Sequence, residues 1–364
     1  MVIRAIRTIL IFAAIAAGFQ PSRGEAGPLD PNQFASLGDL NLTSGLYQFG
    51  AGTGGAPTLA VSNGISFTTI YTGVYSSQGV AVFDFGSINI GSNVSITANA
   101  GLTGPIALLS RSNETIAGRL DVSGGDAFGG PGASNAERGQ DSNFVVRGPG
   151  AAVASGAGGG GFATPGSRGA DALSFNGPFV PPTVIPGAAG GNGPLNLNNI
   201  LTGGSAGGNG FLRGGGGGGG IELGAVGTLT FSGFINANGG DAQDGFMFTG
   251  FGAGGGSGGG IFLHGNSLNL SGSLQALGGA GSHGGSSGFG RASAGGAGGL
   301  GLILAEYDRS GTYQNTAQIG GVFFSAQVPE PSSLVMLGLS TVGVAIVSAF
   351  RRRRQGVTDR AVIG

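Results

Sequence analysis

Two pairs of side chains in this chain combine residue types that could act on a polar substrate. Arg119 and Asp121 are two residues apart, so on a strand both side chains point to the same face. Glu222 and His264 could bring a carboxylate and an imidazole together from two different segments. An arginine and a carboxylate alone are not a mechanism, and a solvated surface pair accounts for them more simply. The sequence therefore predicts no catalytic residue.

Other motifs with a chemical meaning are incomplete. Gly-x-Ser-x-Gly occurs at Ser205, Ser257 and Ser286, but a nucleophile elbow also needs a strand, a turn, a helix and a histidine base. A phosphate-binding loop needs Gly-Lys-Ser/Thr, and the chain has no lysine. His264 and His283 are too isolated to predict a metal site. No cofactor is expected.

Three aspartates leave two interpretations open. Asp126 and Asp241 occupy equivalent places in an internal repeat, and Asp244 follows closely. Carboxylates stacked along one edge could bind calcium, which prefers six to eight oxygen ligands. The favoured alternative is that each aspartate caps a turn through its own backbone. The nonapeptide calcium repeat, Gly-Gly-x-Gly-x-Asp, is not reproduced.

Composition excludes several classes of protein. Of 364 residues, 84 are Gly, and there is no Cys or Trp. Gly-X-Y periodicity is missing, which excludes collagen, and 40% hydrophobic residues argue against simple disorder. Residues 27–328 hold eight Arg against 14 acidic residues, a net charge of −6, so nucleic acid is not an expected partner. No disulfide can support the fold.

The first 26 residues read as a secretory signal peptide. Arg4 and Arg7 precede an apolar run from Ile9 to Phe19, and the small residues Gly24 and Ala26 suit a cleavage site. The alternative is an N-terminal membrane anchor, but the run is shorter than the roughly 20 residues that a span needs.

The other end has three parts in order. Val328, Pro329, Glu330 and Pro331 precede an apolar segment at 334–350, which as a helix would be about 26 Å long and would just cross a bilayer. The topology residues, which follow directly and favour a cytoplasmic end, are Arg351, Arg352, Arg353 and Arg354. A buried core helix beside a basic surface run is the less favoured alternative. The sequence predicts an exported body tethered by its tail.

This tail resembles the PEP-CTERM sorting signal of Gram-negative bacteria that make exopolysaccharide. Residues 328–331 match the motif, and the apolar segment and arginine cluster match its other two parts. The resemblance implies recognition by an exosortase, a membrane transpeptidase that removes the tail near the motif and passes the protein outward. The expected signal is 328–354. The cytoplasmic tail at 355–364 departs from the family pattern, because such signals usually stop soon after the arginines.

Internal repeats predict an all-β body. Residues 219–241 and 259–279 are two copies of one unit, anchored by Ile221 and Ile261, and a third copy begins at Gly104 with Ile106 as its anchor. A partial copy begins at Gly298. Apolar residues alternate within each copy, which is typical of strands with one buried face. Copies stacked about 4.8 Å apart predict a parallel β-helix with glycine and asparagine at its corners. An antiparallel β-sandwich is the alternative.

The repeats also resemble glycine-rich parallel β-helix proteins predicted on bacterial surfaces, in which a GGI-x-L strand is followed by an SG-x-I-x-A-x-GG corner. The matches are residues 220–223 with 232–237, and 260–263 with 271–276. The resemblance implies a fold, since that family has no assigned chemistry.

The expected organisation has two sets of β-helix repeats around a Gly/Pro-rich insert. N-terminal rungs occupy 27–126, the insert 127–213 and C-terminal repeats 214–327. A disordered linker is the default interpretation of the insert. Its scattered aromatic residues favour loops that fold back on the repeats; these are Phe144, Phe162, Phe175, Phe179 and Phe211.

The expected function is that of an exported, noncatalytic surface or extracellular-matrix protein of a biofilm, with a structural or adhesive role. Expected partners are an exosortase, the inner membrane, and either exopolysaccharide or other copies of the chain, with filaments formed through unpaired strands at the ends. The alternative is a carbohydrate-active β-helix enzyme of the lyase or hydrolase type, which would gather several carboxylates and arginines in one groove.

Overall fold

The structure is a computed structural model of the chain. It describes residues 28–99, 101–126, 128–134, 157, 159–174, 183–185, 189–191, 201–209, 213–244, 252–283, 294–308 and 310–328. These residues are all-β, as predicted, with strands, two 3-10 turns and no α-helix. Seventeen strands form one open sheet, and two more form a separate hairpin.

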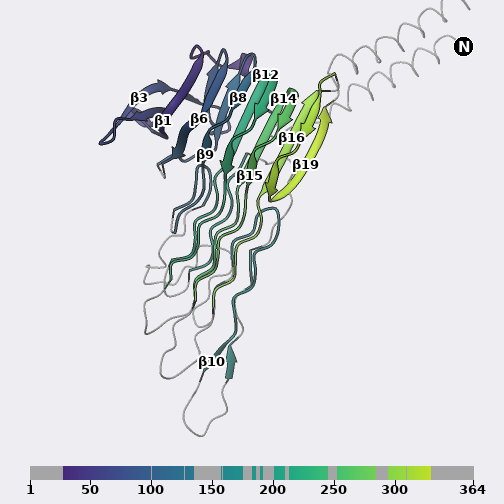
Figure 1. The fold of residues 1–364 in the computed structure, drawn as a ribbon. Helices are drawn as coiled ribbons and strands as arrows, with labels where there is room; N and C mark the ends of the chain where they lie inside the picture. Colours follow the sequence, from purple (N-terminus) through teal and green to yellow (C-terminus); the bar gives the residue numbers. More distant parts are fainter. Residues whose placement is uncertain are drawn as a thin grey trace, which may run out of the picture.

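The N-terminal part is an antiparallel cap on the large sheet. β1 pairs with β2 and β2 with β3, while β4 pairs with β5, all antiparallel. The elements before β5 are η1 (Pro31–Gln33), β1 (Leu40–Ala51), η2 (Thr53–Gly55), β2 (Pro57–Ser62), β3 (Phe67–Thr72) and β4 (Val74–Tyr75). In Figure 1 they lie at one end of the row of strands.

The other strands of the large sheet pair in parallel, and we call them the ladder. They are β5 (Ala81–Phe85), β6 (Ile88–Ala98), β7 (Ile106–Ser110), β8 (Glu114–Ile116), β9 (Arg119–Asp121), β12 (Ile221–Phe231), β13 (Phe234–Asn236), β14 (Gly260–Leu270), β15 (Ser273–Gln275), β16 (Leu302–Asp308), β17 (Tyr313–Asn315), β18 (Gln318–Gly320) and β19 (Val322–Val328). The separate hairpin joins β10 (Ala172–Ser174) to β11 (Thr183–Ile185).

The register of the ladder pairs the residues that the repeat alignment pairs. Ile221 lies opposite Ile261 on one side and Ile106 on the other, and Ile261 lies opposite Ile303. β7 and β12 are therefore direct neighbours, although the whole of the insert separates them along the chain. Strands β5, β7, β12, β14, β16 and β19 follow one another in parallel, and β9, β13, β15 and β18 make a second such row.

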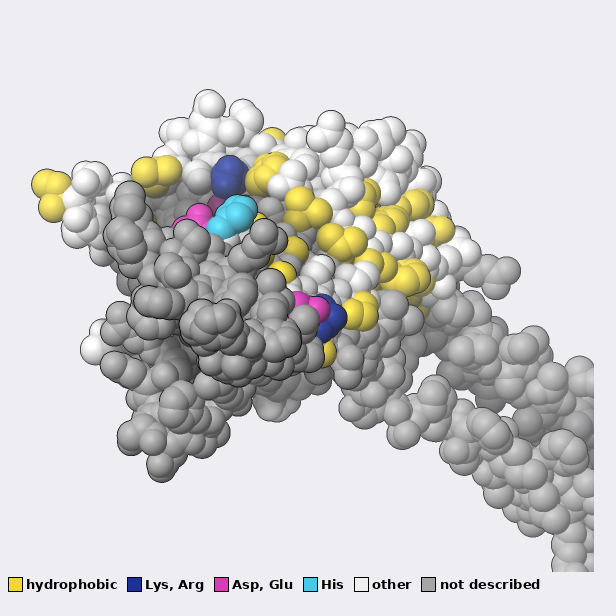
Figure 2. Space-filling view, turned by 90° about the horizontal axis from the view of Figure 1, so that it is seen from below, with side chains coloured by type: hydrophobic (Ala, Val, Ile, Leu, Met, Phe, Trp, Pro, Cys, Tyr) yellow, Lys and Arg dark blue, Asp and Glu magenta, His cyan; other side chains and the backbone are white. Residues whose placement is uncertain are grey.

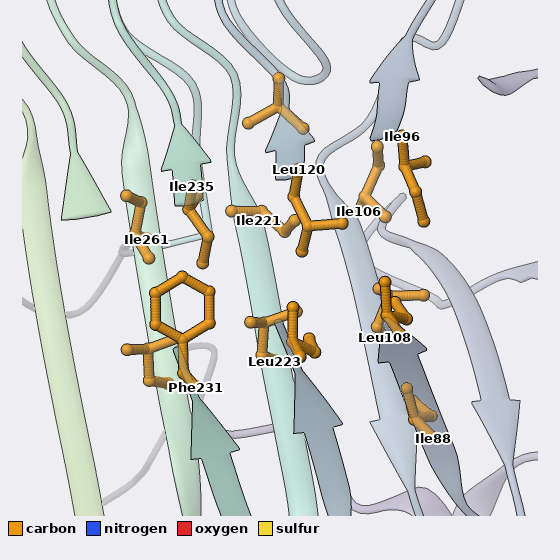
Figure 3. Close-up of a cluster of buried hydrophobic side chains, with 14 of the residues drawn as sticks. Ile88, Ile96, Ile106, Leu108, Leu120, Ile221, Leu223, Phe231, Ile235 and Ile261 are labelled. Atoms are coloured by element: carbon orange, nitrogen blue, oxygen red, sulfur yellow. The ribbon is translucent and has the colours of Figure 1, made fainter. Parts of the chain in front are cut away.

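The alternating side chains of these strands build one continuous apolar interior. Ile106, Ile221 and Ile261 stack across successive strands, and Leu108 and Leu223 form the next layer (Figure 3). All five are fully buried. A single strand of this length cannot bury its apolar face, so the stacking of repeats creates the core.

The glycine-rich segments leave the strands and run beside one another below them (Figure 1). We call them the glycine arms. They comprise residues 122–126, 128–134, 159–170, 201–209, 213–220, 237–244, 252–259, 276–283 and 294–301, and they are joined by backbone hydrogen bonds. Residues 128–134, 159–170 and 201–209 of the insert belong to this set, and their backbone hydrogen bonds hold them against the repeats, as expected of loops that fold back. Phe162 also packs on Phe262, Leu302 and Leu304.

The hydrogen bonds of the glycine arms rotate with a period of three. The N–H groups of consecutive residues 215–220 donate in turn to three neighbouring segments: Gly215 to Gly254, Gly216 to Gly125, Gly217 to Ser134, Gly218 to Ser257, Gly219 to Val122 and Gly220 to Pro131. Three residues per turn is the repeat of a polyproline II helix, which has no internal hydrogen bonds and must find partners outside itself. The arms therefore form a bundle in which the backbone N–H and C=O groups of one arm hydrogen-bond to those of its neighbours.

This bundle corrects the expectation that glycine serves mainly to turn sharp corners. Among the described residues, positive φ angles occur at Gly38, Gly45, Gly54, Gly55, Gly64, Gly79, Gly132 and Gly321, and none lies in the run 214–220. The run instead needs space: a Cβ on Gly218 would lie 2.0 Å from the carbonyl oxygen of Ala237, well inside van der Waals contact. Close approach of backbones, more than left-handed turns, accounts for the glycine.

Candidate functional site

The outer face of the row β5–β7–β12–β14 carries most of the candidate chemistry. In β12, Ile221 and Leu223 point into the core, so Glu222 between them points to the opposite face. The same alternation places Asp84 of β5 and His264 of β14 on that face. On the face seen in Figure 2, the described charged side chains are sparse and lie in small groups.

The structure brings Glu222 and His264 together. Nε2 of His264 lies 2.8 Å from Oε1 of Glu222, and the backbone N–H of Leu29 donates to the same oxygen at 2.8 Å. Gly224 lies opposite His264, and a Cβ there would be 2.1 Å from Nε2. Because residue 224 has no side chain, the imidazole of His264 can extend over it and reach the carboxylate of Glu222. Glu222 is completely buried, and no described residue forms a hydrogen bond with its other oxygen, Oε2.

A second charged pair lies on the same face. Nε of Arg111 donates to Oδ2 of Asp84 at 2.9 Å, and Nη2 of Arg111 donates to the carbonyl oxygen of Phe34. Burial raises the pKa of Asp84 above its usual value, against the opposing effect of Arg111. Oδ1 of Asp84 is buried without a hydrogen-bond partner in the described ranges.

Residues 28–37, which we call the N-terminal strap, lie across this face. Leu29 and Phe34 pack on Val80, Val82, Ala107 and Leu109. The strap is attached to both charged pairs, through the N–H of Leu29 and the carbonyl oxygen of Phe34. A group that transfers protons to a substrate must come within hydrogen-bond reach of it. Since the strap and sheet bury Asp84 and Glu222, these carboxylates act as anchors in this structure.

Arg119 and Asp121 point the same way, as their spacing predicts. Nη2 of Arg119 donates to Oδ2 of Asp121 at 2.6 Å, and the guanidinium lies 5.0 Å from the centre of the Phe234 ring. Partial burial acts to raise the pKa of Asp121, but hydrogen bonds from Arg119 and Ser123 outweigh it and hold the pKa below its usual value. Half of the Arg119 side chain is exposed, as for an ordinary surface pair.

Sequence reasoning missed Glu114, the most unusual carboxyl group of the ladder. Glu114 lies opposite Ile88 and Leu229, in a position that is apolar in both neighbouring rungs. It is fully buried, and neither carboxyl oxygen has a hydrogen-bond partner among the described residues, so burial, and secondarily the charge of Glu222, raises its pKa well above the usual value. The repeat alignment contained the signal, because it places Glu114 where the other copies have leucine.

Two of the three aspartates considered for calcium, Asp241 and Asp244, bind backbone groups of a neighbouring arm. Oδ1 of Asp241 accepts from the N–H of Ala280 at 2.6 Å, and Oδ1 of Asp244 accepts from the N–H of His283 at 3.3 Å. They link two arms, which differs from the expected caps on their own turns. In the described part of the chain no group of three or more His, Asp or Glu side chains could hold a metal ion.

The serines of the Gly-x-Ser-x-Gly matches have structural partners. Oγ of Ser257 accepts from the N–H of Ser205 at 2.8 Å and is fully buried within the glycine arms. Ser286 lies outside the described residues. Neither described serine has the strand–turn–helix context of a nucleophile elbow.

The sorting motif begins where the ladder ends. Val328 is the last residue of β19 and pairs with Asp308 of β16. Pro329, Glu330, Pro331, the apolar segment and Arg351 to Arg354 lie outside the described residues, as does the signal peptide. Within the described ranges, no helix is long and apolar enough to cross a membrane.

Comparison with known families identifies this end. Residues 327–354 match the PEP-CTERM protein-sorting motif, which confirms the interpretation of the tail. The chain therefore carries a PEP-CTERM sorting motif, a signal that in general implies export, anchoring in the membrane at the C-terminus and processing by an exosortase. No curated protein and no solved structure matches the chain significantly.

Proposed function

We propose that this chain is a noncatalytic structural or adhesive protein of the cell surface or extracellular matrix. An exosortase removes its tail near residues 328–331 and releases the body, which acts beside exopolysaccharide in a biofilm. The observation that carries this proposal is the sorting motif directly after the last strand of the ladder. The sorted part is then one continuous stack of repeats.

The body of the protein is, in this proposal, a parallel β-helix with a bundle of glycine arms attached along one side. This part of the proposal is supported by the parallel, in-register pairing of each repeat with the next. The pairing includes the first and second halves of the long strand and the short strand that follows it. Such a stack is rigid because every rung shares its backbone hydrogen bonds and its core with both neighbours. Rigidity and repeated polar faces suit a protein that presents a surface.

One observation favours a second candidate function, that of a carbohydrate-active enzyme. Asp84, Arg111, Glu222 and His264 share one outer face, as the charged residues of a catalytic groove would. The strap that buries the two carboxylates weighs against it. The test is whether the protein releases reducing ends from bacterial polysaccharides. Release by the wild type that is lost in Glu222→Gln would establish the enzyme. We expect no release from either form.

Localisation tests the leading proposal. We expect the full chain to appear outside the inner membrane, with an intact mass that lacks both the signal peptide and the tail. Removal of residues 328–364 should abolish the anchored intermediate and change the destination, whereas the change of Arg360 to Ala, outside the matched motif, should alter neither. An unchanged destination after removal of the tail would contradict the sorting role.

A further inference from the structure

Glu222 can accept more hydrogen bonds than the described residues supply. The N–H of Leu29 and Nε2 of His264 each lie 2.8 Å from Oε1. Oε2 is buried, and no described residue forms a hydrogen bond with it. A buried carboxylate is costly unless donors or an opposite charge compensate it. Oε2 therefore marks a place where a further donor, above all a cationic one, would stabilise the ladder.

The basic side chains that the structure places on this face already have other partners. Nε of Arg111 donates to Asp84, and Nη2 of Arg111 donates to the carbonyl oxygen of Phe34. The imidazole of His264 contacts Oε1 of Glu222, and the chain has no lysine. Neither Arg111 nor His264 supplies a donor to Oε2.

The N-terminal strap brings the start of the mature chain close to Glu222. The predicted signal peptide ends at Ala26, so its removal makes Gly27 the first residue. Pro28 has no N–H, so the first backbone donor before Leu29 is the nitrogen of residue 27. Gly27 itself lies outside the described residues. Since two residues span at most about 7 Å, its nitrogen lies within that distance of the N–H that binds Oε1.

We propose that the α-ammonium of Gly27, created when the signal peptide is removed, binds Oε2 of Glu222 and fixes the strap on the ladder. In the precursor, residue 27 belongs to a peptide bond and offers one neutral N–H. Cleavage replaces it with a charged group that has three donors, beside a carboxylate that Leu29 already binds. The mature strap is then attached to Glu222 through Gly27 and Leu29, and to Arg111 through Phe34.

Removal of the signal peptide thereby stabilises the outer face, a step that rests on the export that the proposed function assumes. A chain that keeps residues 1–26 leaves Oε2 without this donor, so its strap opens more readily. The other acidic residue of the strap, Asp30, is a poorer partner for the ammonium. Asp30 is exposed, where ion pairs contribute little, and its carboxylate already accepts from the N–H and the side-chain amide of Asn32.

The lack of lysine provides a direct test, because the α-amino group is then the single primary amine of the mature chain. The protein is purified from producing cells, its first residue is determined by N-terminal sequencing, and the folded chain is treated with N-hydroxysuccinimidyl acetate. Acylation needs the neutral amine, whereas pairing with a carboxylate favours the ammonium. We expect acylation to be about tenfold slower than in a synthetic peptide of residues 27–30.

Two variants assign the partner of the ammonium. Glu222→Gln should raise the rate of acylation to about that of the peptide, because a neutral amide does not form an ion pair. Asp30→Asn is the matched control, which removes a carboxylate from the strap itself and should leave the rate slow. Thermal unfolding shows whether both variants keep their fold. A further measurement needs no variant: after complete acetylation of the wild type, hydrogen exchange at the Leu29 amide should become roughly tenfold faster.

The possible results separate this pairing from the proposed function. Acylation of the wild type as fast as of the peptide, or a slow rate that persists in Glu222→Gln, would overturn the pairing. Unchanged exchange at Leu29 after acetylation would do the same, as would a mature chain that begins at a residue other than Gly27. Fast acylation in Asp30→Asn alone would assign the ammonium to Asp30 instead. The sorting role is read separately, from the destination of the protein and the loss of its tail.

Discussion

Three buried carboxyl groups of the ladder are stabilised to very different degrees. Asp84 has an arginine and Glu222 has an imidazole and a backbone N–H, but Glu114 has no hydrogen-bond partner within the part of the chain that the structure describes. A buried ionised group without partners is costly, so it takes up a proton. Glu114 is therefore a neutral acid inside an apolar stack over a wide range of pH.

Replacement of Glu114 by leucine should stabilise the protein by about 1–3 kcal/mol, because the desolvation of an unpaired polar group is removed and neighbouring rungs have Ile88 and Leu229 there. The measurement is urea unfolding of the wild type and the variant. A loss of stability would mean that the carboxyl group has a partner after all.

The stability that depends on Glu114 should also change with pH. The folded-state pKa is raised, so the unfolded state loses its proton first. The contribution of the protonated Glu114 to the free energy of unfolding is therefore fully present below the ordinary pKa of a glutamate. It is lost as the pH rises through the raised pKa of the folded state. We expect unfolding titrations to show a gain from Glu114→Leu that grows as the pH rises above the ordinary pKa of a glutamate. A gain independent of pH would contradict the buried acid.

The corresponding change at Glu222 should have the opposite sign. Glu222→Leu leaves the N–H of Leu29 and Nε2 of His264 without their acceptor and should cost about 1–3 kcal/mol. Glu222→Gln, which keeps an acceptor, is the control and should cost less. Hydrogen exchange at the Leu29 amide should become faster in the leucine variant; an unchanged rate would show that Glu222 does not hold the strap.

At the scale of elements, the glycine arms replace the usual second layer of a domain. Segments from the insert and from the C-terminal repeats donate backbone hydrogen bonds to one another, and the arm at 213–220 donates to three neighbouring segments. Burial of apolar side chains contributes little here, since most positions have none. Backbone hydrogen bonds and close packing hold the bundle, and glycine is the residue that permits both.

Replacement of Gly256 by alanine tests this packing. A Cβ there would lie 2.0 Å from the carbonyl oxygen of Gly216, so the two arms must separate, at a cost of about 1–3 kcal/mol. Gly101→Ala is the control, since its Cβ would meet nothing within 4 Å. Differential scanning calorimetry should show a lower Tm only for Gly256→Ala. Equal values for both variants would contradict a tightly packed bundle.

At the scale of the whole molecule, the aspartates of the glycine arms have a structural role that needs no metal ion. Asp241 and Asp244 already accept hydrogen bonds from a neighbouring arm. We therefore expect a metal chelator to leave the Tm unchanged. A fall in Tm that added calcium reverses would favour the calcium interpretation, and Asp241→Asn, which keeps the acceptor oxygen, should then reproduce the fall.

The sequence by itself determined the rungs and the tail. Alternation places Ile221, Ile261 and Ile106 in one register, and the sorting motif is read from consecutive residues, because both signals are local. The tertiary structure alone decided how glycine is used, that β12 lies beside β7, and that the strap covers Glu222. These features depend on contacts between segments far apart in the chain, which local periodicity does not encode. Only the packed structure shows which backbones approach too closely for a side chain.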